Sequence, residues 1–143
     1  MISGDYKPDH ASEAYVWVWL PEQNEPVVAG HIIKQPGMHR FTYGRSYRER
    51  DNAIALSPIE LPLQSGTFEP SGMNTIHSCL RDGAPDAWGR RVINYRYPGF
   101  EPDELDYMLL SGSDRIGALD FQASATEYQP RQAQQVTIEE LLL

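Results

Sequence analysis

Ala-Tyr-Val-Trp-Val-Trp-Leu, at residues 14–20, carries the clearest structural signal in the chain. β-branched and aromatic side chains alternate along it, which is typical of a β-strand with two different faces. Its three aromatic side chains share one face, and its aliphatic side chains share the other. The segment therefore predicts a β-strand.

Further strands are predicted on the C-terminal side of this segment. Residues 27–34 follow a turn bounded by prolines and predict a strand that forms a hairpin with the first. A Pro-Gly turn separates them from residues 39–43, where the alternation returns. Residues 53–56 predict a short apolar strand, and residues 116–121 predict a strand that returns to the sheet. Residues 64–72 are rich in glycine, serine and proline and predict a loop.

The hydrophobic period changes to a helical one from Met73 onward. A first helix is predicted with Asn74 as its N-cap, a second over residues 85–95 and a third over residues 102–110. Residues 138–143 begin a further helix. These elements predict an α+β fold, in which three to four helices pack on a small antiparallel sheet of about four to five strands.

The length of 143 residues suits one domain. We expect residues 1–13 to form a flexible N-terminal segment and residues 14–122 to form the α+β domain. Residues 123–143 are expected to form a polar C-terminal segment that ends in the short helix start.

The composition excludes several classes of protein. The single cysteine, Cys79, rules out an internal disulfide and a multi-cysteine zinc site, and it fits a reducing compartment. No apolar run approaches the roughly 18 residues of a membrane span, and the first ten residues lack the apolar core of a signal peptide. We therefore expect a cytoplasmic protein without membrane contact.

The net charge of −8 argues against direct binding of nucleic acid, because nucleic-acid-binding domains usually carry a basic face. Arg40, Arg45, Arg48 and Arg50 could still form a local basic patch. The simpler interpretation is that these arginines pair with surface acids such as Glu49.

Two pairs of residues have side-chain types that occur in catalytic sites. Asp82 and Asp86 could act as paired carboxylates, but both flank predicted helix ends, where aspartate commonly caps the helix. His77 and Cys79 are two residues apart on a predicted helix, so they point to different faces and do not form a nucleophile–base pair. The sequence therefore predicts no catalytic residue.

Cofactor and metal sites are also not predicted. The four histidines, at positions 10, 31, 39 and 77, lack the spacing of metal ligands. Residues 111–117, Ser-Gly-Ser-Asp-Arg-Ile-Gly, contain glycines but lack the Gly-Lys-Ser/Thr ending of a phosphate-binding loop. We interpret them as a helix-to-strand connection.

Residues 80–91, Leu-Arg-Asp-Gly-Ala-Pro-Asp-Ala-Trp-Gly-Arg-Arg, predict the end of one helix and the start of the next. Tryptophan and arginine are the side chains most enriched at binding hot spots. The sequence therefore predicts a candidate partner interface, made by Pro85, Asp86, Trp88, Arg90 and Arg91. The alternative is that Trp88 is a core residue, packed against the aromatic face of the first strand.

Four motifs in order along the chain carry a family resemblance. They are Phe41-Thr-Tyr-Gly44 with Tyr47, Leu61-Pro-Leu63, Pro-Asp-Ala-Trp-Gly-Arg at 85–90, and Asp114-Arg-Ile-Gly-Ala-Leu119. Together they resemble the N-terminal region of the HipA-type serine/threonine kinase toxins, over about residues 14–121. The resemblance implies a small α+β subdomain that precedes a kinase core. Within these motifs, the residues that we expect to have a structural role are Phe41, Tyr43, Tyr47, Asp114, Arg115 and Gly117, the candidate structural motif.

The resemblance carries over no catalytic, cofactor-binding or metal-binding residue, because the kinase motifs have no counterpart in this sequence. It implies a bacterial toxin–antitoxin system of the kind linked to persistence, and two functions stay open. In the first, the chain is a regulatory subunit that binds and restrains a HipA-type kinase core, with a helix-turn-helix DNA-binding antitoxin as a further partner. In the second, the chain is a truncated N-terminal piece of such a kinase and is inactive alone.

Overall fold

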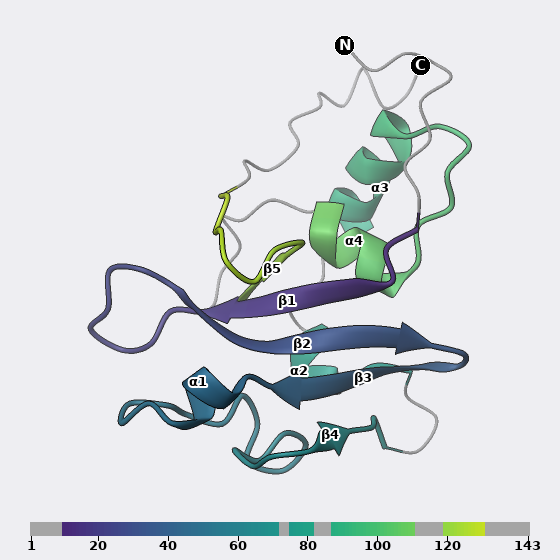
Figure 1. The fold of residues 1–143 in the computed structure, drawn as a ribbon. Coiled ribbons are helices and arrows are strands. Elements are labelled where there is room, and N and C mark those ends of the chain that lie inside the picture. Colours follow the sequence, from purple (N-terminus) through teal and green to yellow (C-terminus); the bar gives the residue numbers. More distant parts are fainter. Residues whose placement is uncertain (1–9, 72–74, 82–86, 111–118, 131–143) are drawn as a thin grey trace.

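An antiparallel sheet of five strands forms the centre of the protein (Figure 1). The computed structural model describes residues 10–71, 75–81, 87–110 and 119–130. The strands lie in the order β4-β3-β2-β1-β5, so the segment at residues 14–20 supplies a strand inside the sheet. Within the described residues the bounds are β1 Glu13–Val18, β2 Val27–Gln35, β3 Met38–Tyr43, β4 Thr67–Phe68 and β5 Leu119–Gln122. The helices are α1 Arg45–Arg48, α2 Ser78–Arg81, α3 Ala87–Arg96 and α4 Glu104–Leu110.

The α+β fold predicted from the sequence is confirmed, and so are the first three strands. β1 and β2 form a hairpin whose register shifts at a bulge between Val16 and Trp17. β2 and β3 join at the Pro-Gly turn, where Gly37 has a φ of 81°. Only glycine adopts that backbone conformation without strain, so the turn depends on this residue.

The strand predicted at residues 53–56 is wrong. Its backbone N–H groups bond to tyrosine hydroxyls instead of a neighbouring strand: Ile54 N donates to Tyr47 Oη and Leu56 N donates to Tyr43 Oη. The predicted loop at residues 64–72 is wrong over two residues, because Thr67 and Phe68 pair with β3 as β4. The short helix α1 was not predicted.

The first predicted helix begins later than expected. Asn74 lies outside the described residues, and residues 75–77 are not helical. The backbone of Thr75 is bonded to β3 instead. Its carbonyl oxygen accepts one hydrogen bond from His39 N and a second from the ring atom His39 Nδ1. The predicted second and third helices are confirmed as α3 and α4, with residues 85–86 outside the described chain. β5 confirms the returning strand over residues 119–121. Residues 116–118 of that predicted strand and the helix predicted to begin at residues 138–143 lie outside the described residues.

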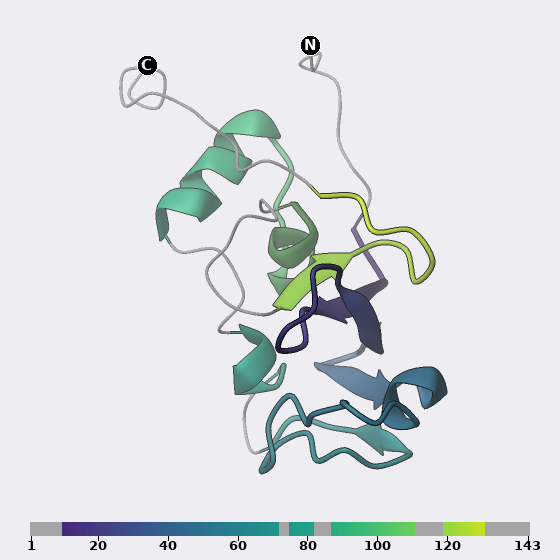
Figure 2. The ribbon, with the colours of Figure 1, turned by 90° about the vertical axis from the view of Figure 1, so that its left-hand side faces the viewer.

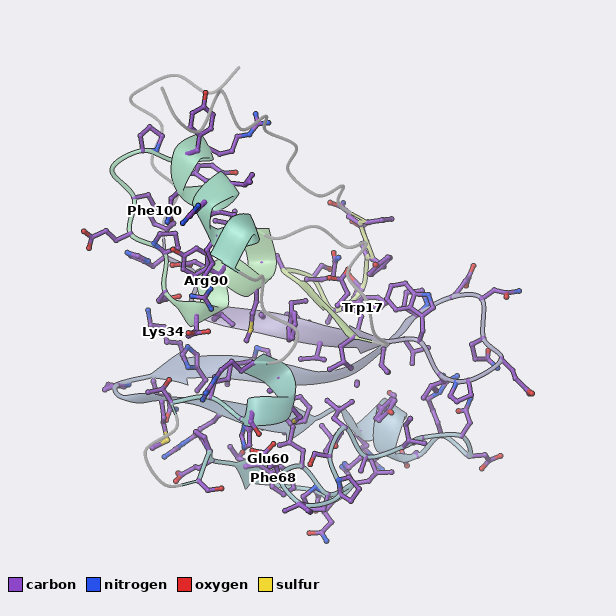
Figure 3. The ribbon with its side chains drawn as sticks, turned by 180° about the vertical axis from the view of Figure 1, so that it is seen from behind. Trp17, Lys34, Glu60, Phe68, Arg90 and Phe100 are labelled. Carbon is purple, nitrogen blue, oxygen red and sulfur yellow. The ribbon has the colours of Figure 1, made fainter. Side chains whose placement is uncertain are left out.

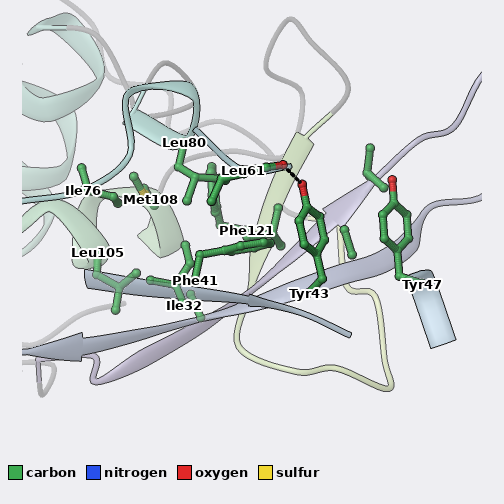
Figure 4. Close-up of a cluster of buried hydrophobic side chains, with 14 of the residues drawn as sticks. Ile32, Phe41, Tyr43, Tyr47, Leu61, Ile76, Leu80, Leu105, Met108 and Phe121 are labelled. Atoms are coloured by element: carbon green, nitrogen blue, oxygen red, sulfur yellow. Dashed lines mark hydrogen bonds between the residues drawn. The ribbon is translucent and has the colours of Figure 1, made fainter. Parts of the chain in front are cut away.

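The core lies on one face of the sheet, which we call the inner face. Helices α1, α2 and α4 and the loop around Leu61 cover this face (Figure 4). Gly30 on β2 leaves room for the Phe41 ring, since a Cβ atom at Gly30 would stand 2.3 Å from Phe41 Cζ. The fully buried residues of the cluster include Val16, Ile32, Phe41, Tyr47, Leu61, Ile76, Leu80, Leu105, Met108 and Phe121. Burial of these side chains is the main source of stability.

The opposite side, the outer face, is polar and aromatic. Its residues alternate with those of the core along the same strands: Tyr15, Trp17, His31, Thr42, Asp120 and Gln122. The rings of Tyr15 and His31 stack at 4.5 Å, and both side chains are partly exposed.

Helix α4 lies against β1 and β5, and α3 packs against α4 (Figure 2). Among the described residues, no helix combines the length and apolar character needed to span a membrane.

Candidate partner-binding site

Helix α3 holds the part of the predicted partner interface that the structure describes. Trp88 lies in the first turn of its backbone, whereas Pro85 and Asp86 and the side chain of Trp88 fall outside the described part of the chain. Val92 and Ile93 are buried and fix the inward side of the helix. The helix carries three arginines and no acidic residue, in a chain of net charge −8.

Arg90 and Arg91 are adjacent in sequence but occupy different environments. The guanidinium of Arg90 lies 4.5 Å from the centre of the Tyr107 ring and 3.4 Å from Glu104 Oε2, so it ties α3 to α4 (Figure 3). Arg91 is exposed. Tyr95, one helical turn further on, is 46% exposed, although it is a large aromatic side chain. The outward surface of α3 therefore comprises Arg91, Asn94 and Tyr95.

The start of α4 gathers polar side chains from three parts of the chain. Asp103 and Asp106 bond to each other's backbone N–H groups at 3.0 Å, which is the reciprocal arrangement of a capping box. Asp106 is buried and also accepts a hydrogen bond from Ala11 N at 2.7 Å, while His10 Nδ1 lies 2.6 Å from its Oδ2. Lys34 from β2 pairs with Asp103.

The cluster of His10, Asp103 and Asp106 has the donor types of a metal site, and its ligand atoms lie within 4.8 Å of one another. Each carboxylate already accepts a hydrogen bond of the capping box and has a further side-chain partner, His10 for Asp106 and Lys34 for Asp103. Burial opposes ionisation of Asp103, but the Lys34 ammonium and the Asp106 N–H hold the pKa of that carboxyl below its usual value. We therefore interpret the cluster as a structural network that anchors residues 10 and 11 to α4. Sequence spacing could not reveal it, because His10 and Asp106 are 96 positions apart.

The aromatic members of the candidate structural motif lie together in the core. Tyr43 and Tyr47 stack with their ring centres 6.0 Å apart, and Phe41 meets Tyr43 edge-on at 4.8 Å. Tyr43 Oη donates to Leu61 O and accepts from Leu56 N, so one hydroxyl holds two points of the following loop (Figure 4). Burial raises the pKa of Tyr43 to about 12. The other members, Asp114, Arg115 and Gly117, lie outside the described residues.

The described residues around α2 surround Cys79 with groups that do not activate its thiol. Glu60 accepts hydrogen bonds from Ser78 N, Ser78 Oγ and Cys79 N, at 3.1, 2.7 and 3.1 Å. Burial, with the Glu60 carboxylate beside it, raises the pKa of the Cys79 thiol to about 11. Burial lowers the pKa of His77. Cys79 is therefore a protonated thiol at neutral pH, which is the opposite of what a nucleophilic cysteine requires.

Three of the four arginines at positions 40–50 contact neighbouring polar side chains. Arg40 pairs with Glu69 at 2.7 Å, and Arg45 pairs with Glu49 at 3.4 Å. Arg50 Nε donates to Asn52 Oδ1 at 3.2 Å. The predicted pairing with surface acids is thus confirmed for Arg40 and Arg45.

Sequence reasoning missed one further cluster, where Tyr128 meets the aromatic side of β1. Its ring centre lies 5.4 Å from that of Trp17 and 5.2 Å from that of Trp19. In the sequence, Tyr128 is an isolated aromatic residue in a polar segment. Only the structure shows that it contacts the two tryptophans.

The sequence matches a model of a protein family. The model described as the HipA N-terminal domain matches residues 16–122. This chain belongs to the HipA N-terminal domain family. A comparison with curated proteins finds no match to the chain. The HipA N-terminal domain match covers β1 from Val16 onward, the other four strands and the four described helices, so α3, α4 and nearly all of the sheet belong to the shared domain.

Proposed function

We propose that this chain is a non-catalytic interaction domain that binds a HipA-type serine/threonine kinase core and restrains it. The observation that carries the proposal is the HipA N-terminal domain match over residues 16–122. A phosphoryl-transfer enzyme needs a loop that cradles phosphate, a base-positioning aspartate and ligands for Mg²⁺. The motifs for these parts have no counterpart in the sequence, so the kinase chemistry would come from the partner.

The outward side of α3 is the surface that we propose for this contact. Arg91 and Tyr95 are exposed one turn apart, and arginine and tyrosine are enriched at interface hot spots. Arg90 stabilises the position of this surface, because its contacts with Glu104 and Tyr107 fix α3 on α4. Pro85, Asp86 and Trp88 would extend the surface at the start of the helix. The cationic helix favours an acidic patch on the kinase core.

The test is binding and autophosphorylation with a HipA-type kinase core from the same genome. We expect the full chain to co-elute with the kinase and to lower autophosphorylation several-fold. Arg91→Glu combined with Tyr95→Ala should weaken binding at least tenfold. The control is Arg45→Glu, the same reversal of charge on exposed α1, which should leave binding within twofold. Unchanged autophosphorylation together with the absence of a complex would refute the proposal.

A second candidate follows from the family itself, whose description is that of an N-terminal domain. In that case the chain is the first part of a HipA-type kinase, and the same α3 surface packs on the kinase core within one polypeptide. The reading frame after Leu143 distinguishes the two. An in-frame kinase core supports the second candidate, and a separate kinase gene supports the regulatory subunit.

The remaining parts of the proposal concern the setting. A helix-turn-helix DNA-binding antitoxin would be the third component of the toxin–antitoxin system, and DNA contact would pass through it. We place the protein in the cytoplasm, which fits its single cysteine. Direct DNA binding by the isolated chain, weakening as salt rises, would contradict this division of roles.

A further inference from the structure

The outer face of the sheet is closed over β1 and β5 by a segment without regular structure. We call residues 123–130 the strap; they follow β5 directly and lie beyond the HipA N-terminal domain match. In Figure 3 the labelled Trp17 lies beside β5 and the start of the strap. The strap thus covers a surface that the family domain itself provides.

Three side chains of the sheet form the surface under the strap. Trp17 is 7% exposed, and Asp120 and Gln122 are buried although they are polar. Trp17 and Asp120 are direct partners across β1 and β5, and Gln122 projects on the same side. An indole beside a buried carboxylate and a buried amide offers both an apolar platform and directed hydrogen-bonding groups.

The strap uses each of these groups. Tyr128 places its ring against Trp17 and Trp19 and donates its hydroxyl to Asp120 Oδ2 at 2.7 Å. The indole Nε1 of Trp17 donates to Ser124 O at 2.9 Å, and Gln129 N donates to Gln122 Oε1 at 3.2 Å. These contacts are those of a peptide segment bound through one tyrosine anchor and two backbone groups.

The strap is held more weakly than the elements of the core. Residues 123, 126, 127, 129 and 130 are exposed, and the strap adds no strand to the sheet. When it lifts, Asp120 keeps hydrogen bonds from Phe121 N at 2.8 Å and from Gln122 Nε2 at 3.0 Å. No buried carboxylate is stranded by the opening, so the strap can open locally without unfolding the sheet.

We propose that the strap is a displaceable cover over a peptide-binding surface, and that this surface takes a segment of a partner protein with a tyrosine in the place of Tyr128. The tyrosine ring stacks on Trp17 and Trp19, and its hydroxyl bonds to Asp120. The proposal does not depend on a kinase partner, and its test needs none.

The first measurement is hydrogen exchange of the Trp17 indole N–H in the unaltered chain, followed by NMR. Trp17→Phe assigns the resonance. We expect exchange at least tenfold faster than that of core amides such as Ile32, with little dependence on low denaturant concentrations. Exchange at the rate of the core amides would show that the strap opens only on global unfolding and would overturn the proposal.

The second measurement is binding of the synthetic peptide Ac-Ala-Ser-Ala-Thr-Glu-Tyr-Gln-Pro-NH2 to the full chain carrying Tyr128→Ala. The Trp17 indole resonance should move toward its position in the unaltered chain, with a dissociation constant of about 0.1 mM or less, at least tenfold below the roughly millimolar effective concentration of the tethered strap. The unaltered chain should bind the peptide at least tenfold more weakly. A peptide with phenylalanine for tyrosine should also bind about tenfold more weakly, since it lacks the bond to a carboxylate.

Ser124→Ala provides a second route if Tyr128→Ala does not fold. Ser124 Oγ accepts hydrogen bonds from Thr126 N and Glu127 N, both at 3.1 Å, so its loss loosens the strap without touching the sheet. Equal binding of the tyrosine and phenylalanine peptides would overturn the role of Asp120. A dimer of the loosened variants on size exclusion would assign the surface to a second copy of the chain and overturn the assignment to a partner protein.

Discussion

The two faces of the same sheet are closed in different ways. On the inner face, helices α2 and α4 and the Leu61 loop bury a continuous cluster that reaches from Ile32 to Met108. On the outer face, the described chain covers β1 and β5 with the strap, while Tyr15 and His31 remain partly exposed. Adjacent residues of one strand therefore belong to different levels of stability.

This difference separates the face that stabilises the fold from the surfaces that we propose for binding. The inner face is formed by elements far apart in sequence, so its loss requires global unfolding. The outer face and the outward surface of α3 carry exposed polar and aromatic groups on a scaffold that stays folded. Local opening at surfaces of this kind costs less free energy than global unfolding.

Phe41→Ala and Thr42→Ala give the largest test of this difference, because the two residues are neighbours on β3 that face opposite sides. Phe41 is fully buried over Gly30, whereas Thr42 is partly exposed and bonds to Thr67 at the sheet edge. We expect Phe41→Ala to lower the free energy of unfolding by roughly 3–5 kcal/mol, from lost burial and the cavity left behind.

Thr42→Ala serves as the matched control and should cost about 0.5 kcal/mol. Chemical denaturation at one pH, with equal m-values for both variants, measures the two effects. Similar losses for both variants would mean that the faces contribute equally, and the comparison would fail.

Tyr43→Phe tests the inner face at the level of a single hydroxyl. Its removal leaves Leu61 O and Leu56 N without the partner that joins them. Because both groups lie at or near the core, we expect a loss of about 1–3 kcal/mol in the free energy of unfolding. Tyr107→Phe is the control, since its hydroxyl bonds to Asn94 at an exposed position. A loss below that of the control would show that the loop does not depend on Tyr43.

His77→Leu tests the core through its pH dependence. Burial holds the pKa of His77 below its ordinary value of 6.5, with the Glu60 carboxylate opposing the shift. As the pH falls below 6.5, the unfolded chain binds the proton first, so stability falls. The slope from this group reaches at most about 1.4 kcal/mol per pH unit.

Denaturation midpoints at pH 7 and pH 5 measure the effect. We expect His77→Leu to show a smaller fall than the unaltered chain. Leu80→Ala in α2, which lowers stability without removing a titrating group, should retain the full fall. A fall of the same size in all three proteins would exclude His77 as its source.

The sequence predicted what depends on local pattern. The alternation at residues 14–20 and the Pro-Gly turn at 36–37 gave the hairpins, since both act within a few residues. β4 was missed because its two residues are defined only by pairing with Phe41 and Thr42 of β3. The strand expected at 53–56 failed because tyrosine hydroxyls from elsewhere satisfy its backbone.

The same limit applies to the candidate site. Arg90 and Arg91 looked equivalent in sequence, and only the position of Glu104 and Tyr107 on α4 separates the structural arginine from the exposed one. Tyr128 lies in a segment that the sequence predicts simply as polar. Its contacts with Trp17 and Trp19 were missed because they join residues more than a hundred positions apart. Such contacts leave no periodic trace in the chain.

Tyr128→Phe gives the smallest effect on global stability and contrasts directly with Tyr43→Phe. The variant keeps the ring on Trp17 and Trp19 and removes only the hydroxyl bonded to Asp120. Asp120 retains its bonds from Phe121 and Gln122, so no acceptor is stranded. We expect a loss of about 1 kcal/mol or less in the free energy of unfolding. The same deletion should speed exchange of the Trp17 indole N–H several-fold, because the strap alone is loosened. Denaturation and indole exchange, measured on both tyrosine variants, check this reversal. If Tyr128→Phe lowered global stability as much as Tyr43→Phe does, the strap would be an integral part of the fold and the two faces would form one cooperative unit.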